Sequence, residues 1–139
     1  MKTRRFFLIP FLALFSSSAF AGTSQGYGMG GAFAPFDAVI AQANASGELF
    51  RIQGHCQSAC TMFLGIRNVC VERSAQLLFH AGREKGAITA AATARMTTMY
   101  NASLRDYVES NHYMDTLTLH PIPGSVIIDR FGYKECPKR

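Results

Sequence analysis

The chain has 139 residues, the length of one domain, and 48% of them are hydrophobic. Its formal net charge is +5, but three of its 14 Lys and Arg residues fall in the first 21 positions, so residues 22–139 carry 11 minus 9, or +2. Basic residues form no run interleaved with aromatic ones, so the charge pattern gives little support to a nucleic-acid-binding protein.

The first 21 residues have the pattern of a secretory signal peptide. A basic start precedes an apolar run at 6–15, and Ala19-Phe20-Ala21 matches the small-x-small rule for cleavage. The apolar run is too short to span a bilayer, so we expect no stable membrane insertion. We expect cleavage after Ala21 and a single mature domain over residues 22–139, periplasmic or secreted from a bacterium. A general secretory signal is favoured over a twin-arginine signal, because paired arginines are common in ordinary signal peptides.

The mature chain begins with a glycine-rich stretch, Gly22–Gly31, that is nearly free of β-branched residues. We expect a mobile N-terminus that tightens into a turn at Gly30-Gly31. Apolar residues then recur at helical spacing, which predicts an amphipathic helix over Phe36–Asn44. Ala45-Ser46-Gly47 should end this helix.

The most informative stretch is Gly54–His80. A β-like run at 49–54 ends on glycine, and an apolar segment at 59–66 is long enough for about two helical turns. Ser58 therefore falls at a strand-to-helix turn, where free backbone N–H groups favour negative charge. An acyl-transfer nucleophile needs that placement, because the oxyanion forms beside it.

Two further β-like runs, at 68–72 and 76–79, lead to His80. The chain beyond should contain a charged turn at Gly82–Gly86 and a long helix over Ala87–Asn111 with a buried stripe of Met96, Tyr100, Leu104 and Val108. We then expect a short helix at His112–Leu119 and a proline turn at Pro121–Gly124. Ser125 should open another short helix, Ser125–Phe131, and Gly132–Arg139 should be a tail.

All four cysteines lie in the mature part, and an even count in an exported chain predicts two disulfides with three connectivities. We favour Cys56 with Cys136 and Cys60 with Cys70, because the tail has little apolar surface and closing a long loop stabilises most. Three alternatives stay open. Cys56, Cys60 and Cys70 could bind zinc together with His80, Cys60 could be a catalytic thiolate, or one labile pair could serve a thiol redox protein. We expect no cofactor and no metal.

Residues 30–131 resemble the catalytic subunit of Clp-type serine peptidases in the crotonase-like superfamily, and the whole chain resembles small exported bacterial proteins with that core and four cysteines. The matching features are the Gly30-Gly31 turn, a helix, a strand ending in glycine, Ser58 27 residues after Gly31, and His80 22 residues after Ser58. The resemblance implies an α/β fold, a Clp/crotonase-like ββα spiral.

The same resemblance implies roles for five residues. Ser58 would be the nucleophile, His80 the general base and Asp129 the acid that orients the imidazole, while the N–H groups of Gly31 and Ala59 would bind the oxyanion. The function implied is a serine hydrolase acting on a peptide or acyl substrate. Asp106 and Asp115 are alternative acids.

Two departures from the family pattern matter. No apolar strand precedes the Gly-Gly turn, so the spiral should be truncated at its N-terminal strand. The segment that stacks peptidase subunits into rings is absent from the sequence, and no ATPase partner is expected outside the cytoplasm. Each candidate also has a plain structural interpretation: Ser58 as a helix cap, His80 as a partly buried hydrogen-bonding residue, and Asp129 as a surface carboxylate. A non-catalytic binding or structural module on the same scaffold is therefore the competing function, and the oligomeric state stays open.

Overall fold

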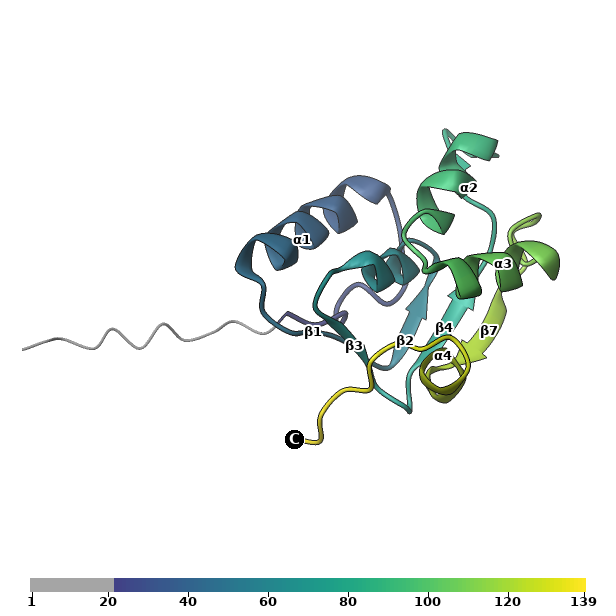
Figure 1. The fold of residues 1–139 in the computed structure, drawn as a ribbon. Coiled ribbons are helices and arrows are strands. Elements are labelled where there is room, and N and C mark those ends of the chain that lie inside the picture. The colour runs from purple at the N-terminus through teal and green to yellow at the C-terminus, as the bar shows by residue number, and fades with distance from the viewer. Residues whose placement is uncertain (1–21) are drawn as a thin grey trace, which may run out of the picture.

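The computed structural model describes residues 22–139 as a mixed α/β structure of helices and small sheets (Figure 1), and the expected signal peptide lies outside these residues. None of the helices in this part of the chain is long and apolar enough to cross a membrane. The elements, in chain order, are α1 (Phe33–Ser46), β1 (Phe50–Ile52), β2 (His55–Gln57), the 3₁₀ helix η1 (Ser58–Gly65), β3 (Val69–Val71), β4 (Gln76–Phe79), β5 (Arg83–Glu84), β6 (Ala87–Ile88), α2 (Ala90–Thr97), α3 (Ala102–Ser110), β7 (His120–Pro123) and α4 (Gly124–Asp129).

Two short parallel pairs form the centre of the fold. β1 pairs with β3, with Arg51 opposite Cys70, and β2 pairs with β4, with Cys56 opposite Leu77. β7 extends the second pair as an antiparallel edge strand. Gly54, with φ 62°, lies between β1 and β2, where the chain changes direction. η1 connects β2 of one pair to β3 of the other, and Ser58 is its first residue.

The sequence predicts a mobile glycine-rich N-terminal segment, but in the structure this segment is bound along β1 and β2. It forms no regular strand, yet Thr23 makes a parallel bridge to Arg51 and the Gln57 N–H donates to the Gly28 carbonyl at 2.9 Å. A Cβ at Gly28 would lie 2.2 Å from the His55 carbonyl oxygen, so only glycine allows this approach. The segment thus lies along the edge of β1 and β2, bound through its backbone.

The hydrophobic core is built around η1. Its residues from Ala59 to Leu64 are all buried, and the Phe63 ring lies 4.8 to 5.6 Å from the rings of Tyr27, Phe36 and Phe50. This explains why the segment is apolar on every side. The helix expected at Phe36–Asn44 is confirmed as the longer α1, which ends at Ser46 and is followed by Gly47 in the left-handed conformation.

The long helix expected over Ala87–Asn111 is wrong, because the segment breaks into β6, α2 and α3. Asn101 separates the two helices: its side-chain oxygen accepts from the Leu104 N–H at 2.9 Å, and its amide donates to the Phe131 carbonyl at 2.7 Å. Thr89 caps α2 in the same way by accepting from the Ala92 N–H. The apolar stripe of this segment is buried as expected, from Met96 to Val108.

Smaller differences lie on either side of these helices. His112–Leu119 forms turns and bends instead of a helix, and Pro121-Ile122-Pro123 belongs to β7. Proline is tolerated there because β7 is an edge strand. The charged turn at Gly82–Gly86 carries β5, which pairs with β6 in a small hairpin.

Both expected disulfide pairings are wrong. The bonds join Cys56 to Cys60, with Cα atoms 5.2 Å apart, and Cys70 to Cys136, with Cα atoms 4.8 Å apart. The tail is tied to the core, but it runs beside β3 and not beside β2. The Val71 N–H donates to the Lys134 carbonyl at 2.8 Å, and this pairing brings Cys136 to Cys70.

Removing the Cys70–Cys136 bond by the double substitution C70A/C136A should lower the free energy of unfolding by about 4 kcal/mol, since it closes the longer loop of the two disulfides. The C56A/C60A variant should lose only about 2 kcal/mol by the same entropic argument. Urea denaturation under non-reducing conditions measures both. Equal losses would show that loop length does not control the stabilisation.

Candidate active site

Ser58 lies where β2 passes into η1, as the sequence predicts. Its backbone is in the left-handed region with φ 57°, whereas the preceding Gln57 is extended with φ −107° and ψ 158°. Non-glycine residues rarely adopt this conformation, and a serine held this way at a strand-to-helix turn projects its hydroxyl out of the turn. The side chain is half-buried and borders a pocket.

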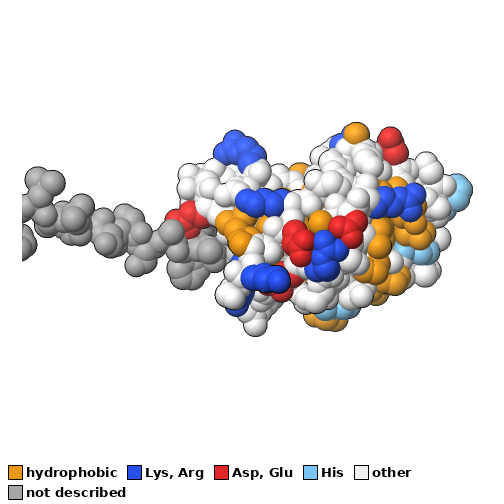
Figure 2. Space-filling view, turned by 60° about the horizontal axis from the view of Figure 1, so that its bottom comes forward, with side chains coloured by type: hydrophobic (Ala, Val, Ile, Leu, Met, Phe, Trp, Pro, Cys, Tyr) orange, Lys and Arg blue, Asp and Glu red, His pale blue; other side chains and the backbone are white. Residues whose placement is uncertain are grey.

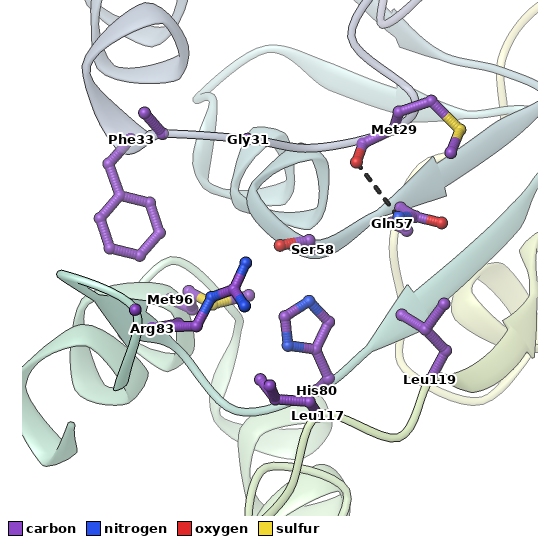
Figure 3. Close-up of a pocket in the computed structure, with 12 residues that line it drawn as sticks. Met29, Gly31, Phe33, Gln57, Ser58, His80, Arg83, Met96, Leu117 and Leu119 are labelled. Atoms are coloured by element: carbon purple, nitrogen blue, oxygen red, sulfur yellow. Dashed lines mark hydrogen bonds between the residues drawn. The ribbon is translucent and has the colours of Figure 1, made fainter. Parts of the chain in front are cut away.

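We call this cavity the Ser58 pocket, and it has a volume of about 490 Å³, within the usual range for ligand sites. Its lining comes from the N-terminal segment, α1, β2, the chain after β4, α2 and the loop before β7 (Figure 3). The residues are Met29, Gly31, Ala32, Phe33, Gln57, Ser58, His80, Arg83, Gly86, Met96, Leu117 and Leu119.

Contacts on three sides hold the Ser58 turn. The Cys56–Cys60 disulfide bridges the turn from strand to helix. On the second side, the buried Thr61 hydroxyl donates to the Ser58 carbonyl at 2.7 Å and accepts from the Tyr100 hydroxyl at 2.6 Å. Burial raises the pKa of Tyr100 well above its usual value, although the bond to Thr61 opposes this shift. Tyr100 therefore stays a neutral donor.

Gly30 closes the third side of the turn. A Cβ at this position would lie 2.7 Å from the Ser58 Cβ and 2.9 Å from the Gln57 carbonyl oxygen. The Gln57 side-chain amide also donates to the Met29 carbonyl at 3.1 Å, a bond drawn in Figure 3. The expected Gly-Gly turn therefore packs directly against the serine.

His80 follows β4 and enters the same pocket, where its ring is directed toward Ser58 (Figure 3). The His80 Nδ1 lies 2.6 Å from the Ala81 carbonyl oxygen. A carbonyl only accepts hydrogen bonds, so Nδ1 carries the proton, and in the neutral ring Nε2 presents its lone pair. No hydrogen bond within residues 22–139 joins His80 to Ser58, although both side chains line the Ser58 pocket.

The assignment of Asp129 as the orienting acid is wrong. Its carboxylate receives two hydrogen bonds from the Arg73 guanidinium, at 2.8 and 3.1 Å, and Arg73 also binds Glu135 of the tail. The Arg73 hydrogen bond lowers the pKa of Asp129. Asp129 does not line the pocket, so its role is to tie α4 to the tail.

The alternative acids do not replace it. Asp115 pairs with His112 at 2.8 Å, Asp106 is exposed on α3, and neither lines the pocket. On the face drawn in Figure 2, basic and acidic side chains are interspersed with hydrophobic ones.

Within the described residues, the group that orients the His80 ring is the Ala81 carbonyl. A backbone carbonyl has no residue signature, so no pattern in the sequence could have identified it.

Two backbone donors stand beside Ser58. None of the hydrogen bonds recorded among residues 22–139 uses the N–H of Gly31 or of Ala59. The Ala59 N–H belongs to the first turn of η1, where helical N–H groups have no partner within the helix, and Gln57 provides no side-chain cap. Of the two expected oxyanion donors, Gly31 borders the Ser58 pocket, whereas Ala59 is buried directly after Ser58.

The zinc site and the catalytic thiolate are contradicted, because all four cysteines are in disulfides. No group of three or more His, Cys, Asp and Glu residues in the described part of the chain is arranged to hold a metal ion. Cys56 and Cys60 are fully buried, which disfavours rapid thiol exchange at their bond. One residue that the sequence interpretation missed is Arg83, which lines the pocket; its position three residues after His80 was the available signal.

Comparisons with protein-family models, curated proteins and solved structures find no match to this chain. The function is therefore argued from the residues of the Ser58 pocket.

The close packing of Gly30 on Ser58 predicts that Gly30→Ala destabilises the protein more than Gly26→Ala. Both glycines have positive φ, 71° and 89°, so both substitutions carry the left-handed strain of about 1–2 kcal/mol. Only Gly30→Ala adds a clash, because nothing lies within 4 Å of a Cβ at Gly26. We expect an additional loss of about 1–3 kcal/mol in the free energy of unfolding. Equal losses in urea denaturation would contradict the packing.

The raised pKa of Tyr100 predicts a loss of stability at alkaline pH. Above the ordinary phenol pKa of about 10, the unfolded chain releases this proton while the folded chain keeps it, so unfolding becomes more favourable as pH rises. Tyr100→Phe should cost about 1 kcal/mol at neutral pH through the lost hydrogen bond, and should lose less stability than the parent above about pH 10. Urea denaturation at both pH values tests this. Burial also raises the pKa of Tyr133, so part of the alkaline loss should remain in the variant.

Proposed function

We propose that the chain is an exported serine hydrolase with a Clp/crotonase-like core, in which Ser58 is the nucleophile and His80 the general base. One observation carries the proposal: a serine in the left-handed conformation at a strand-to-helix turn shares a pocket with a histidine whose Nδ1 is bonded to a carbonyl. That bond leaves the His80 Nε2 as the proton acceptor, which a serine nucleophile requires.

The proposed reaction is acyl transfer to water. The Ser58 hydroxyl rotates into contact with His80 Nε2 when substrate binds, since catalytic hydrogen bonds commonly tighten in the Michaelis complex. Ser58 Oγ then attacks the carbonyl carbon and Nε2 takes its proton. The tetrahedral oxyanion accepts hydrogen bonds from the N–H groups of Gly31 and Ala59.

Collapse of this intermediate breaks the bond to the leaving group, which receives the proton from His80. A water molecule, deprotonated by His80, then attacks the acyl-serine and releases the acid and Ser58. The Ala81 carbonyl holds the ring orientation throughout. Because this carbonyl is neutral, it stabilises the imidazolium less than a carboxylate would, so we expect a slower enzyme than one with a full triad.

The fold and the disulfides support the proposed family and location. A parallel β2–β4 pair with a serine turn after β2 and a histidine after β4 is the order that the Clp-like resemblance implies. Two disulfides are typical of proteins that fold in oxidising compartments, which fits a periplasmic protein.

A non-catalytic binding module is the second candidate. It is favoured by the missing Ser58–His80 hydrogen bond and by the absence of a carboxylate from the residues that line the Ser58 pocket. The same pocket would then bind a peptide or acyl group without turnover. Reaction with an active-site label distinguishes the two functions.

A fluorophosphonate should label the native protein at Ser58, as located by peptide mass spectrometry. Ser58→Gly should abolish labelling while keeping the fold, because glycine tolerates the left-handed backbone. His80→Gln should slow labelling by about 10²- to 10⁴-fold through loss of the general base. Asp129→Asn is the control and should label at the parental rate, because Asp129 does not line the pocket.

Two results would reject the catalytic proposal. Folded native protein that resists the label would indicate the binding module, and equal labelling rates for the parent and His80→Gln would remove His80 from the mechanism. Circular dichroism of each variant shows whether it is folded.

A further inference from the structure

We propose that the substrate carries a carboxylate close to the scissile carbonyl and that Arg83 binds this carboxylate. The inference rests on the proposed function, and it names the class of substrate that the Ser58 pocket takes. Arg83 begins β5, three residues after His80, and its guanidinium lies beside the His80 ring in Figure 3. It is the one Lys, Arg, Asp or Glu among the residues that line the pocket.

Arg83 differs from the other arginines of the described chain in having no partner there. Of eight arginines at 22–139, seven bind a carboxylate, a carbonyl or a side-chain amide or lie over an aromatic ring, whereas the exposed Arg83 makes no hydrogen bond, ion pair or ring contact with these residues. A guanidinium has five N–H donors in a planar fork that matches a carboxylate. An unpaired fork beside the nucleophile and the base is therefore suited to an anionic group of the substrate.

The position of Arg83 is set by the base of its hairpin. The Gly82 N–H donates to the Thr93 hydroxyl of α2 at 2.9 Å, and the Thr89 N–H donates to the Gly82 carbonyl at 3.3 Å. A Cβ at Gly82 would lie 2.2 Å from the Ala92 backbone, so the chain between His80 and Arg83 packs tightly on α2. Both residues are thus presented to the pocket from one anchored segment.

The surroundings of Arg83 favour apolar groups next to the carboxylate. Exposed large hydrophobic residues gather here: Met29 is 73% exposed, Leu117 44% and Leu119 39%, and all three line the pocket. Ile88, 46% exposed, pairs with Arg83 across the hairpin. These side chains offer contacts to apolar side chains of a peptide.

The expected substrate is therefore an apolar peptide with a carboxylate near the scissile bond. The carboxylate could belong to the peptide C-terminus or to an acidic side chain beside the scissile carbonyl. In either case the acyl–nitrogen bond breaks, water supplies the hydroxyl to the acyl carbon and a proton to the released amine, and the carboxylate stays unchanged as the recognised group.

Binding to the Ser58→Ala protein tests the inference without requiring turnover. Three probes differ in their carboxylate: N-acetyl-Leu-Leu with a free C-terminus, its neutral C-terminal amide, and N-acetyl-Leu-Glu amide, in which a side-chain carboxylate replaces the second leucine side chain. We expect calorimetry or NMR titration to give at least one carboxylate probe about 10- to 100-fold tighter binding than the neutral amide, as for a charge-assisted hydrogen-bonded pair. The tighter of the two carboxylate probes identifies the source.

Arg83→Gln in this background should remove the preference for the carboxylate probes over the neutral amide. Lys85→Gln is the matched control, because it removes the same charge from the same hairpin at a residue that does not line the pocket. It should keep the preference. Loss of the preference in Lys85→Gln as well, its survival in Arg83→Gln, or equal binding of all three probes would overturn the inference. Carboxylate-selective binding by a protein that resists the fluorophosphonate would reject the hydrolase while retaining Arg83 as the anion-binding residue.

Discussion

The left-handed backbone of Ser58 is the constraint on which the candidate site depends. This conformation costs about 1–2 kcal/mol for a residue with a Cβ, so it persists only where the surroundings enforce it. Here the Cys56–Cys60 disulfide bridges the turn, the Thr61 hydroxyl holds the Ser58 carbonyl, and Gly30 packs against the Ser58 side chain. A plain helix cap would need none of these supports. Together these contacts hold Ser58 at the edge of the Ser58 pocket.

The orientation of His80 follows from the backbone around it. Its Nδ1 donates to the Ala81 carbonyl, and the Ala81 N–H in turn donates to the Thr116 carbonyl at 2.8 Å. This chain of hydrogen bonds connects the ring to the loop before β7, which also contributes Leu117 and Leu119 to the pocket. In the proposed hydrolase, this peptide dipole would take the orienting role that a carboxylate has in a triad, while adding no negative charge to the pocket. Arg83 can therefore attract an anion there without a competing internal partner.

Neither the N-terminal segment nor the tail has enough apolar surface to fold by itself, so each is held by bonds to the rest of the domain. The segment at 22–28 is bound by backbone hydrogen bonds to β1 and β2, which places the Gly30-Gly31 turn beside Ser58. The tail is bound by the Cys70–Cys136 disulfide and by Arg73, which bridges Asp129 and Glu135. Asp129 thus contributes to the attachment of the tail.

The sequence by itself determined the features that depend on local patterns. Apolar spacing located α1, β4 and the buried stripe from Met96 to Val108, and the junction of a β-like run with an apolar helix placed Ser58 at its turn. Tertiary structure decided what depends on contacts distant in the chain. Cysteine pairing follows distances between strands, so Cys136 bonds to Cys70 because the tail runs beside β3. The break at Asn101 depends on its bond to the Phe131 carbonyl, 30 residues away. The orientation of His80 comes from a backbone carbonyl, and because every residue has one, the sequence alone does not indicate which carbonyl it is.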